Sequence, residues 1–243
     1  MNKTIRRILL IVCICVFAYS AYIIGSIFYS YWKVDNDNNT LASEVIENKK
    51  ADSALKRKVD FKKLNKINED IIGWIYIPHT EIDYPLLKGK NNDSYIHTNY
   101  KKNYSFAGCI FADEISSRTL TDDNTIIYGH NMKNGSMFAG IKKFVSLKYM
   151  NKHPNVYIYL PNGTVNVYNI FSANVINVAS KLYCKGIDYN KYIQQIFSSG
   201  CRAKKSVSRT QAPLIMLSTC HAAHAVSRNV IYARLEKNVK AGN

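Results

Sequence analysis

The chain has 243 residues, 47% of them hydrophobic and 21% charged, and its formal net charge is +16. This mixture excludes a disordered chain and is enough for one substantial globular core plus additional segments. The positive charge favours anionic surfaces such as nucleic acid, an anionic envelope or lipid headgroups, and a solvated lysine-rich surface explains it equally well. Charge alone therefore identifies no partner.

The first predicted element is a membrane-spanning helix. Three basic residues within the first seven positions precede Ile8 to Trp32, which are 25 residues without a charged side chain. A helix of that length measures roughly 37 Å, enough to cross a hydrocarbon layer of about 30 Å. A cleaved signal peptide is the alternative, but its apolar region is usually about 7 to 15 residues long. Tyr29, Tyr31 and Trp32 also resemble an interfacial aromatic belt.

We therefore expect residues 1–32 to form a cytoplasmic N-terminus and an uncleaved single-pass anchor. Basic residues before a span remain in the cytoplasm, so the rest of the chain is expected outside the cell membrane. That topology argues against nucleic acid as a partner.

Residues 33–70 are expected to connect the anchor to the globular domain. Residues 33–53 are polar and poor in aromatic side chains, which is typical of a stalk or a first surface helix. From Ser53 to Asp70, apolar residues recur at helical spacing among lysines. This pattern predicts an amphipathic helix, or a pair of helices, on the flank of the domain.

Short apolar segments separated by turn residues dominate residues 71–243. Each is rich in Ile, Val, Tyr or Phe, as expected of a strand. The eight segments are WIYIP, IDYPLL, GCIFA, NTIIYG, NVYIYLP, TVNVYNIFSANVI, APLIMLST and RNVIYARL. Because no helix follows each strand in turn, they predict a mainly β, antiparallel barrel or sandwich and not a doubly wound sheet.

Two helices are predicted to interrupt these strands. One covers Ser136 to Phe144, and the other covers Ile187 to Ser199 in the long connection from 179 to 212. In the second, Asp188 is suited to cap the first turn and Gly200 to end the helix.

The six cysteines do not form the pattern of a disulfide framework. Cys13 and Cys15 lie in the predicted span, and Cys109 lies in a predicted strand. Cys184 and Cys201 flank a predicted helix whose ends would be roughly 18 Å apart. That separation disfavours a bridge between them.

The segment LSTCHAAHAVSR, residues 217–228, brings together residue types that suit nucleophilic catalysis. A thiol nucleophile needs activation to the thiolate, an acid for the leaving group and a positive charge near the oxyanion. If APLIMLST and RNVIYARL pair antiparallel, Arg228 lies opposite the end of the first strand, whereas Arg234 is roughly 20 Å further along. Cys220 and Arg228 are therefore candidate site residues.

Three histidines compete for the acid–base role. His221 and His224 are close to Cys220 in sequence, whereas His130 lies in IIYGHNM at the end of another predicted strand. Spacing alone does not choose among them, and Cys220 taken alone is also consistent with a small buried residue. The other histidines have no companion pattern and are expected to be structural: His79, His97 and His153.

Two of these motifs resemble the sortase family, the membrane-anchored cysteine transpeptidases of Gram-positive bacteria. They are YGHNM around His130 and LSTC followed eight residues later by an arginine. INEDIIGWIYIPHTEIDYPLLK, GCIFAD and the helix in the 179–212 connection are similar to class B members in particular. The resemblance covers nearly all of the chain after the anchor. One departure is Met216, where sortases usually have threonine in a TLxTC pattern, which affects local packing more than chemistry.

The resemblance implies a closed eight-stranded barrel over residues 71–243 with flanking N-terminal helices. It implies that Cys220 is the nucleophile, that His130 is the general acid and base, and that Arg228 stabilises the oxyanion or the substrate's carbonyl groups. Ser218 and Thr219 are the expected substrate contacts.

The implied substrates are secreted proteins with a C-terminal signal similar to NPxTG or NPQTN, cleaved after threonine, and the implied acceptor is a peptidoglycan amine. No cofactor is expected. No metal is expected either, because the sequence lacks the close Cys/His spacing of zinc sites and a carboxylate cluster suited to calcium.

Four alternative functions share parts of this pattern. An L,D-transpeptidase lacks support because its histidine and glycine immediately before the cysteine are absent here, and a papain-like hydrolase begins a helix with its cysteine. An envelope-binding module that keeps the barrel without catalysis remains open. So does a pilin-polymerising sortase, although such enzymes often carry a lid segment and a second, C-terminal span.

Overall fold

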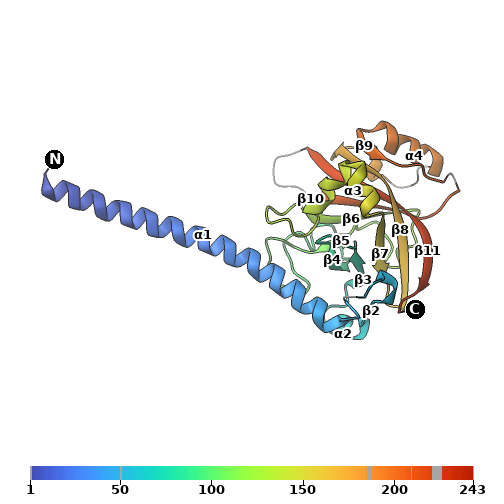
Figure 1. Cartoon of the computed structure of the whole chain (residues 1–243), viewed down its shortest axis with the longest axis horizontal. Helices are drawn as coiled ribbons and strands as arrows, with labels where there is room; N and C mark the ends of the chain where they lie inside the picture. The colour runs from blue at the N-terminus through green and yellow to red at the C-terminus, as the bar shows by residue number, and fades with distance from the viewer. Residues whose placement is uncertain are drawn as a thin grey trace. The chain divides into compact units, whose positions relative to one another are not determined.

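The computed structural model describes residues 2–49, 51–184, 186, 188–208, 210–220 and 226–242, with the backbone alone at Cys220. The chain divides into two compact units, residues 1–40 and 41–243. Helix α1 (Lys3–Val45) makes up the first unit and continues into the second (Figure 1).

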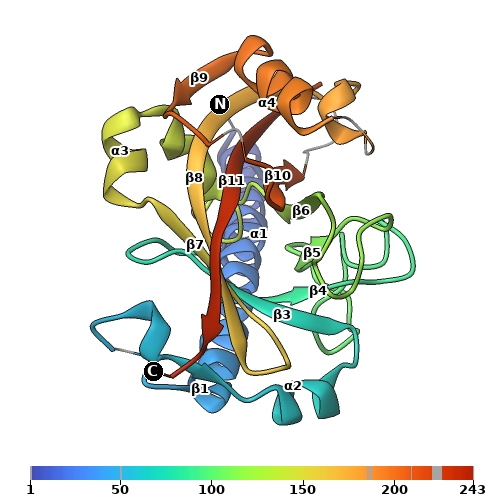
Figure 2. The ribbon, with the colours of Figure 1, turned by 90° about the vertical axis from the view of Figure 1, so that its right-hand side faces the viewer.

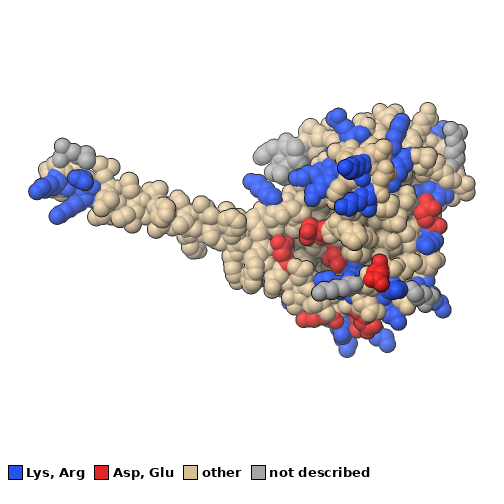
Figure 3. Space-filling model, in the orientation of Figure 1, with Lys and Arg blue, Asp and Glu red and all other residues tan. Residues whose placement is uncertain are grey.

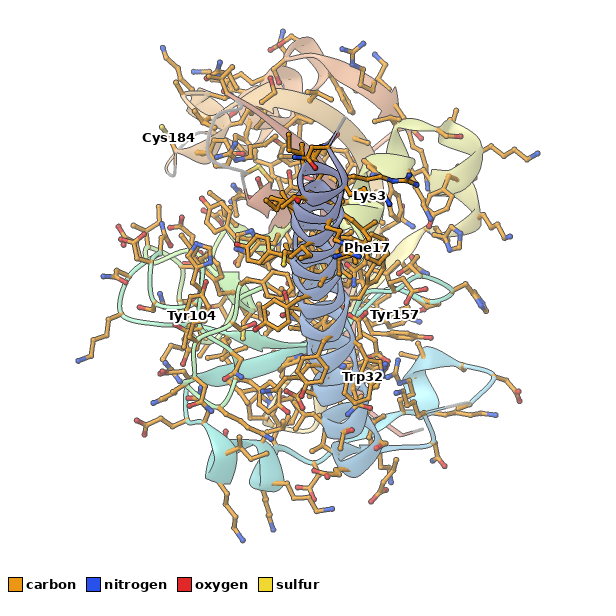
Figure 4. The ribbon with its side chains drawn as sticks, turned by 90° about the vertical axis from the view of Figure 1, so that its left-hand side faces the viewer. Lys3, Phe17, Trp32, Tyr104, Tyr157 and Cys184 are labelled. Atoms are coloured by element: carbon orange, nitrogen blue, oxygen red, sulfur yellow. The ribbon has the colours of Figure 1, made fainter. Side chains whose placement is uncertain are left out.

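The first unit is one long apolar helix. Its side chains, such as Phe17 and Trp32, project outward from α1 (Figure 4). The helix is long and apolar enough to cross a membrane, with a mean hydropathy of 2.6 over its most apolar window. The region that the sequence assigned to a stalk or a first surface helix is helical as far as Val45. α1 is therefore the candidate membrane span.

The second unit begins with elements on the flank of the sheet. β1 (Ile46–Glu47) pairs with β2 (Lys58–Val59), and η1 (Ala54–Lys56) and α2 (Phe61–Ile67) follow the two strands in turn. The amphipathic region predicted from Ser53 to Asp70 is thus a short 3₁₀ helix and a short α-helix. Leu41, before β1, and Leu64, in α2, are buried in one core cluster with Trp74 of the sheet. This burial holds the segment from Leu41 to Leu64 against the sheet.

Eight strands close into a barrel in the order β11-β10-β6-β5-β4-β3-β7-β8, with β8 pairing back to β11 (Figure 2). They correspond to the eight predicted segments, so the predicted mainly β, closed barrel is confirmed. β9 (Cys201–Lys204) is added at the side of β8. The barrel strands are β3 (Ile71–Tyr76), β4 (Asp83–Leu87), β5 (Ile110–Ala112), β6 (Asn124–His130), β7 (Asn155–Tyr159), β8 (Thr164–Asn177), β10 (Leu214–Cys220) and β11 (Ser227–Lys240).

The expectation of an antiparallel sheet is wrong for two pairs of strands. β4 pairs with β5, and β6 pairs with β10, in parallel. A parallel pair needs a crossover connection, which residues 88–109 provide for the first pair and the chain from β7 to β9 provides for the second. Strand composition does not reveal this arrangement. Its consequence is that β6 and β10 end at the same edge of the sheet.

Helices fill two of the connections. η2 (Ala139–Val145) and α3 (Leu147–Lys152) lie between β6 and β7, where one helix was predicted from Ser136. η3 (Lys181–Tyr183) and α4 (Tyr189–Ser198) lie between β8 and β9.

The predicted features of α4 are present. The Asp188 carboxylate accepts a hydrogen bond from the Lys191 amide at 3.0 Å, and Gly200, just after the helix, has a φ of +73°. Tyr192 and Ile196 pack in one buried cluster with Met216, so the unusual methionine fills a core position. The thiols of Cys184 and Cys201 are free, so the bridge disfavoured by the sequence is not formed.

Candidate active site

The parallel pairing of β6 and β10 brings two of the predicted site residues together. The strands run in register from Leu214 opposite Asn124 to Cys220 opposite His130. Residues paired in this way lie level with one another in neighbouring strands. Two residues that are far apart in the sequence therefore meet where both strands end.

Arg228 lies on the other side of β10. β10 and β11 are antiparallel, with Ser218 opposite Val230, and the Thr219 hydroxyl accepts a hydrogen bond from the Asn229 amide at 3.2 Å. The paired residues of the two strands end at Ser218 and Val230, and Arg228 lies two residues before Val230, at the start of β11. Arg234 instead pairs with Leu214 at the far end of β10, as the antiparallel pairing predicted.

The imidazole of His130 is held by the segment that connects β4 to β5. Its Nε2 lies 2.8 Å from the carbonyl oxygen of Ile96, and its ring stacks on that of His97 with centroids 5.5 Å apart. Because a carbonyl only accepts hydrogen bonds, Nε2 carries the proton. Nδ1 is therefore the nitrogen of the neutral ring that can accept a proton.

Burial lowers the pKa of His130, and His97 lowers it further, while the hydrogen bond to Ile96 opposes this shift. Desolvation penalises the imidazolium, and a second imidazole nearby disfavours an added positive charge. His130 is therefore mainly neutral near neutral pH.

Gly108 fixes the position of the Ile96 carbonyl. It has a φ of +55°, and a Cβ atom at this position would collide with the carbonyl oxygens of Tyr95 and Ile96. The Cys109 amide donates to the Tyr95 carbonyl at 3.0 Å, which closes the same turn. The glycine before the strand GCIFA thus permits the close approach that positions a hydrogen-bond partner of His130.

Ser218 and Thr219, the predicted substrate contacts, are buried and bonded within the protein. Ser218 is 0% exposed, and its hydroxyl lies 2.9 Å from the Tyr183 hydroxyl. Thr219 is 3% exposed and bonds to the backbone of Asn229. Tyr183, from η3, also stacks on Tyr128. Their role as substrate contacts stays a prediction.

The other histidines fall into three groups. His221 and His224 lie outside the described residues. His153 is 4% exposed, with Nδ1 3.0 Å from the Pro78 carbonyl, and its ring lies near that of His79. His97, also expected to be structural, stacks on His130.

Sequence reasoning missed the neighbours of His130, since no local pattern marks them. His97 lies in an irregular segment without helical or strand periodicity, and its ring also approaches Tyr104, an 82% exposed residue labelled in Figure 4. Among the residues that the structure describes, no group of three His, Cys, Asp or Glu side chains is arranged to hold a metal ion.

Comparison with known proteins gives one consistent result. Residues 75–236 match the family model described as the Sortase domain. A curated protein, Sortase B of Listeria monocytogenes, is 33% identical over 213 residues, which are 82% of this chain and 86% of that protein.

Two solved structures extend the comparison. Sortase B of Clostridium perfringens is 32% identical with a TM-score of 0.65 and covers 73% of this chain and 100% of its own. A Streptococcus pyogenes class B sortase involved in pilus biogenesis is 27% identical with a TM-score of 0.68, covering 73% of this chain and 98% of its own.

Proposed function

The chain belongs to the sortase family of cysteine transpeptidases and is similar to its class B members. We propose that it cleaves a C-terminal sorting motif of the NPxTG or NPQTN kind after threonine and transfers the secreted protein to a peptidoglycan amine. The observation that carries this proposal is the register that pairs Cys220 with His130 at the ends of parallel strands. Arg228 follows on the antiparallel neighbour of the same strand.

In the first half-reaction, the Cys220 sulfur attacks the threonine carbonyl carbon, and the thiol proton passes to Nδ1 of His130. The Arg228 guanidinium donates hydrogen bonds to the oxyanion of the tetrahedral intermediate. The intermediate collapses by breaking the carbon–nitrogen bond, and the departing amine takes the proton from His130. The products are a thioacyl enzyme and the released C-terminal peptide.

In the second half-reaction, the acceptor amine attacks the thioester carbon and gives its proton to His130. The carbon–sulfur bond then breaks, and Cys220 regains a proton from the imidazolium. One acid–base group serves both steps because the second reverses the proton transfers of the first. The lowered pKa of His130 favours the neutral imidazole, the form that can accept a proton in the first step.

The proposed arrangement in the cell follows from the N-terminal helix. Residues 1–32 would be the cytoplasmic end and membrane anchor, residues 33–70 the stalk and N-terminal helices, and residues 71–243 the catalytic domain. Three basic residues before the span support a cytoplasmic N-terminus. The catalytic domain would then meet secreted proteins outside the membrane.

Mass spectrometry of the full chain in nonionic detergent, incubated with internally quenched pentapeptides, tests the proposal. We expect cleavage after threonine and an acyl adduct on Cys220. Cys220→Ala should lose the adduct and the cleavage, and His130→Ala should lose the cleavage. Cys184→Ala, which removes an exposed thiol elsewhere, should keep both. Cleavage that survives Cys220→Ala would contradict the mechanism.

Pilin polymerisation is a second candidate, supported by the similarity to a class B sortase involved in pilus biogenesis. The two functions differ in the acceptor. A thioacyl enzyme that transfers to a peptidoglycan stem peptide, and not to a lysine of a pilin subunit, would favour wall anchoring. A non-catalytic binding module would bind cell wall equally in the wild type and in Cys220→Ala, without forming an adduct.

A further inference from the structure

The charge of this protein is strongly divided along the chain. Residues 124–243 contain 16 of the 33 Lys and Arg residues but only two of the 17 acidic residues, Asp188 and Glu236. This half therefore carries +14 of the formal net charge of +16. A field of one sign on one part of a domain attracts a partner of the opposite sign.

Six of these basic side chains gather on adjoining elements. η2 lies against both α3 and β9, and basic side chains cover this region in the space-filling view (Figure 3). The structure describes each of the six as exposed. We call this set the basic surface: Lys142, Lys143, Lys148, Lys152, Arg202 and Lys204.

The six charges are not neutralised within the described part of the chain. None of them forms an ion pair with a described carboxylate, and the pairs that do exist, such as Arg118 with Asp70, lie outside this surface. The Nζ atoms of Lys143 and Lys204 lie over the rings of Tyr149 and Phe197, 6.0 and 5.3 Å from the ring centroids.

One carboxylate borders the basic surface. Burial, with a contribution from Glu81, raises the pKa of the Tyr149 phenol, which places Glu81 close to α3. Glu81 lies in the β3–β4 hairpin, and Tyr149 belongs to α3, one of the three elements of the surface.

The basic surface is far from the point where the chain enters the second unit. Val165 of β8 packs in the cluster that includes Leu41, whereas Ala173 of β8 pairs with Ala203 of β9. Eight residues of strand separate Val165 from Ala173, a distance of about 26 Å. In Figure 2, α3 and β9 accordingly lie at the upper end of the second unit and β1 and α2 at the lower end.

We propose that the basic surface binds a phosphate-bearing anionic polymer. Lysine ammonium groups spread over three elements suit a flexible chain with many charges, because each contact is a point-charge interaction without a fixed geometry. A flexible polymer with a phosphate in every repeat unit can place a negative charge against each of the three elements, which argues for a polymer as the partner. Binding would hold the enzyme within an anionic envelope and is separate from peptide cleavage.

The test uses the full chain in phosphatidylcholine nanodiscs and fluorescein-labelled poly(glycerol phosphate), with binding followed by anisotropy. The variant replaces Lys142, Lys143, Lys148 and Lys152 by Gln. The matched control replaces four exposed lysines at the other end of the unit by Gln and changes the net charge equally: Lys49, Lys56, Lys62 and Lys66.

We expect the surface variant to lose about tenfold or more in affinity, and its slope of log K against log salt to weaken by roughly 3, since each neutralised phosphate contributes about 0.7 to 0.9. The control should change affinity less than about twofold. Thermal unfolding and pentapeptide cleavage should be unchanged in both variants. Equal loss in the two variants would overturn the proposal, because it would show an effect of net charge alone.

A second arm distinguishes a lipid surface. Val145 and Leu147 are 40% and 47% exposed among the lysines, a combination that also occurs on proteins that bind membrane surfaces. The nanodisc-bound chain is therefore mixed with phosphatidylglycerol vesicles and separated by flotation. Binding to vesicles that is lost in the surface variant, without binding to the polymer, would overturn the proposal in favour of the membrane.

Discussion

The imidazole rings of His97 and His130 stack with their centroids 5.5 Å apart and their planes inclined by 20°. The His97 ring in this contact lowers the pKa of His130, which is the last residue of β6. The contact couples an irregular segment between β4 and β5 to the proposed acid–base residue. We therefore expect His97 to act as a positioning residue for the proposed reaction.

Replacing His97 by Gln is expected to raise the pKa of His130. The variant removes a neighbour that opposes the imidazolium, while burial and the Ile96 carbonyl remain. NMR titration of the imidazole in a Cys220→Ala background measures this pKa directly. We expect a wild-type midpoint below the ordinary value of about 6.5 and a higher midpoint in His97→Gln. An unchanged midpoint would show that the stack does not act on the charge.

The lowered pKa also makes stability depend on pH. The folded state binds a proton at His130 less readily than the unfolded chain does. The contribution of His130 to the free energy of unfolding is therefore complete above about pH 6.5. The contribution falls as the pH drops through the lowered pKa. Urea unfolding between pH 7 and pH 5 should show a smaller loss of unfolding free energy in His130→Gln than in the wild type. The same loss in both would assign the pH dependence to other groups.

Gly108→Ala is expected to destabilise the fold and to impair the reaction of the molecules that do fold. A methyl group here would displace the Ile96 carbonyl that holds His130 Nε2. Small misplacements of a reacting group cost up to about 100-fold, so kcat/KM for pentapeptide cleavage should fall roughly 10- to 100-fold.

Gly163→Ala is the matched control for Gly108→Ala. Gly163 also has a positive φ, +80°, but a Cβ there has no atom within 4 Å. Both variants carry backbone strain of about 1 to 2 kcal/mol, but only Gly108→Ala should lose activity. Equal kcat/KM values in the two variants would contradict a positioning role for the Ile96 carbonyl.

Arg57→Ala is expected to reduce the free energy of unfolding by about 3 kcal/mol. The Arg57 guanidinium donates to both carboxylate oxygens of Asp83 at 2.8 Å and lies 3.7 Å from the centre of the Tyr76 ring. Its side chain is 2% exposed, so the variant leaves a vacated space and a carboxylate with one partner fewer. Asp83 keeps a hydrogen bond from Trp74 Nε1 at 2.6 Å, which limits the loss.

Urea unfolding of the full chain in detergent measures this effect. Arg57→Lys should fall between the wild type and Arg57→Ala, because lysine keeps the charge but loses the fork of donors. Lys56→Ala removes an exposed neighbouring charge and should change stability by less than about 0.5 kcal/mol. A loss in Lys56→Ala as large as that in Arg57→Ala would argue against the ion pair as the cause.

Asp188→Ala is expected to destabilise α4 by about 1 kcal/mol. The variant removes the acceptor for the Lys191 amide at the first turn. Hydrogen exchange should then be faster in α4 than in α2, where Asp60 caps the first turn independently. Exchange that is uniform across both helices in Asp188→Ala would contradict a local effect.

Local sequence pattern was sufficient for the strands and for α4. Each barrel strand is a short run of β-branched and aromatic residues bounded by turn residues, so its identity depends on neighbours only a few positions away. The same holds for the Asp188 cap. It does not hold for strand direction: the parallel pairs β4–β5 and β6–β10 depend on crossovers of many residues, and the composition of a strand does not record them.

The sequence by itself determined that a cysteine ends one strand, that His130 ends another and that Arg228 begins a third, because these are properties of single segments. Only the tertiary structure decided that β10 lies between β6 and β11, so that the strand ending in Cys220 has the strand of His130 on one side and the strand of Arg228 on the other. It also decided that Ile96 and His97 pack on His130. Such contacts join residues remote in the chain, and their energies come from barrel closure and from burial shared by several elements, which no local pattern encodes.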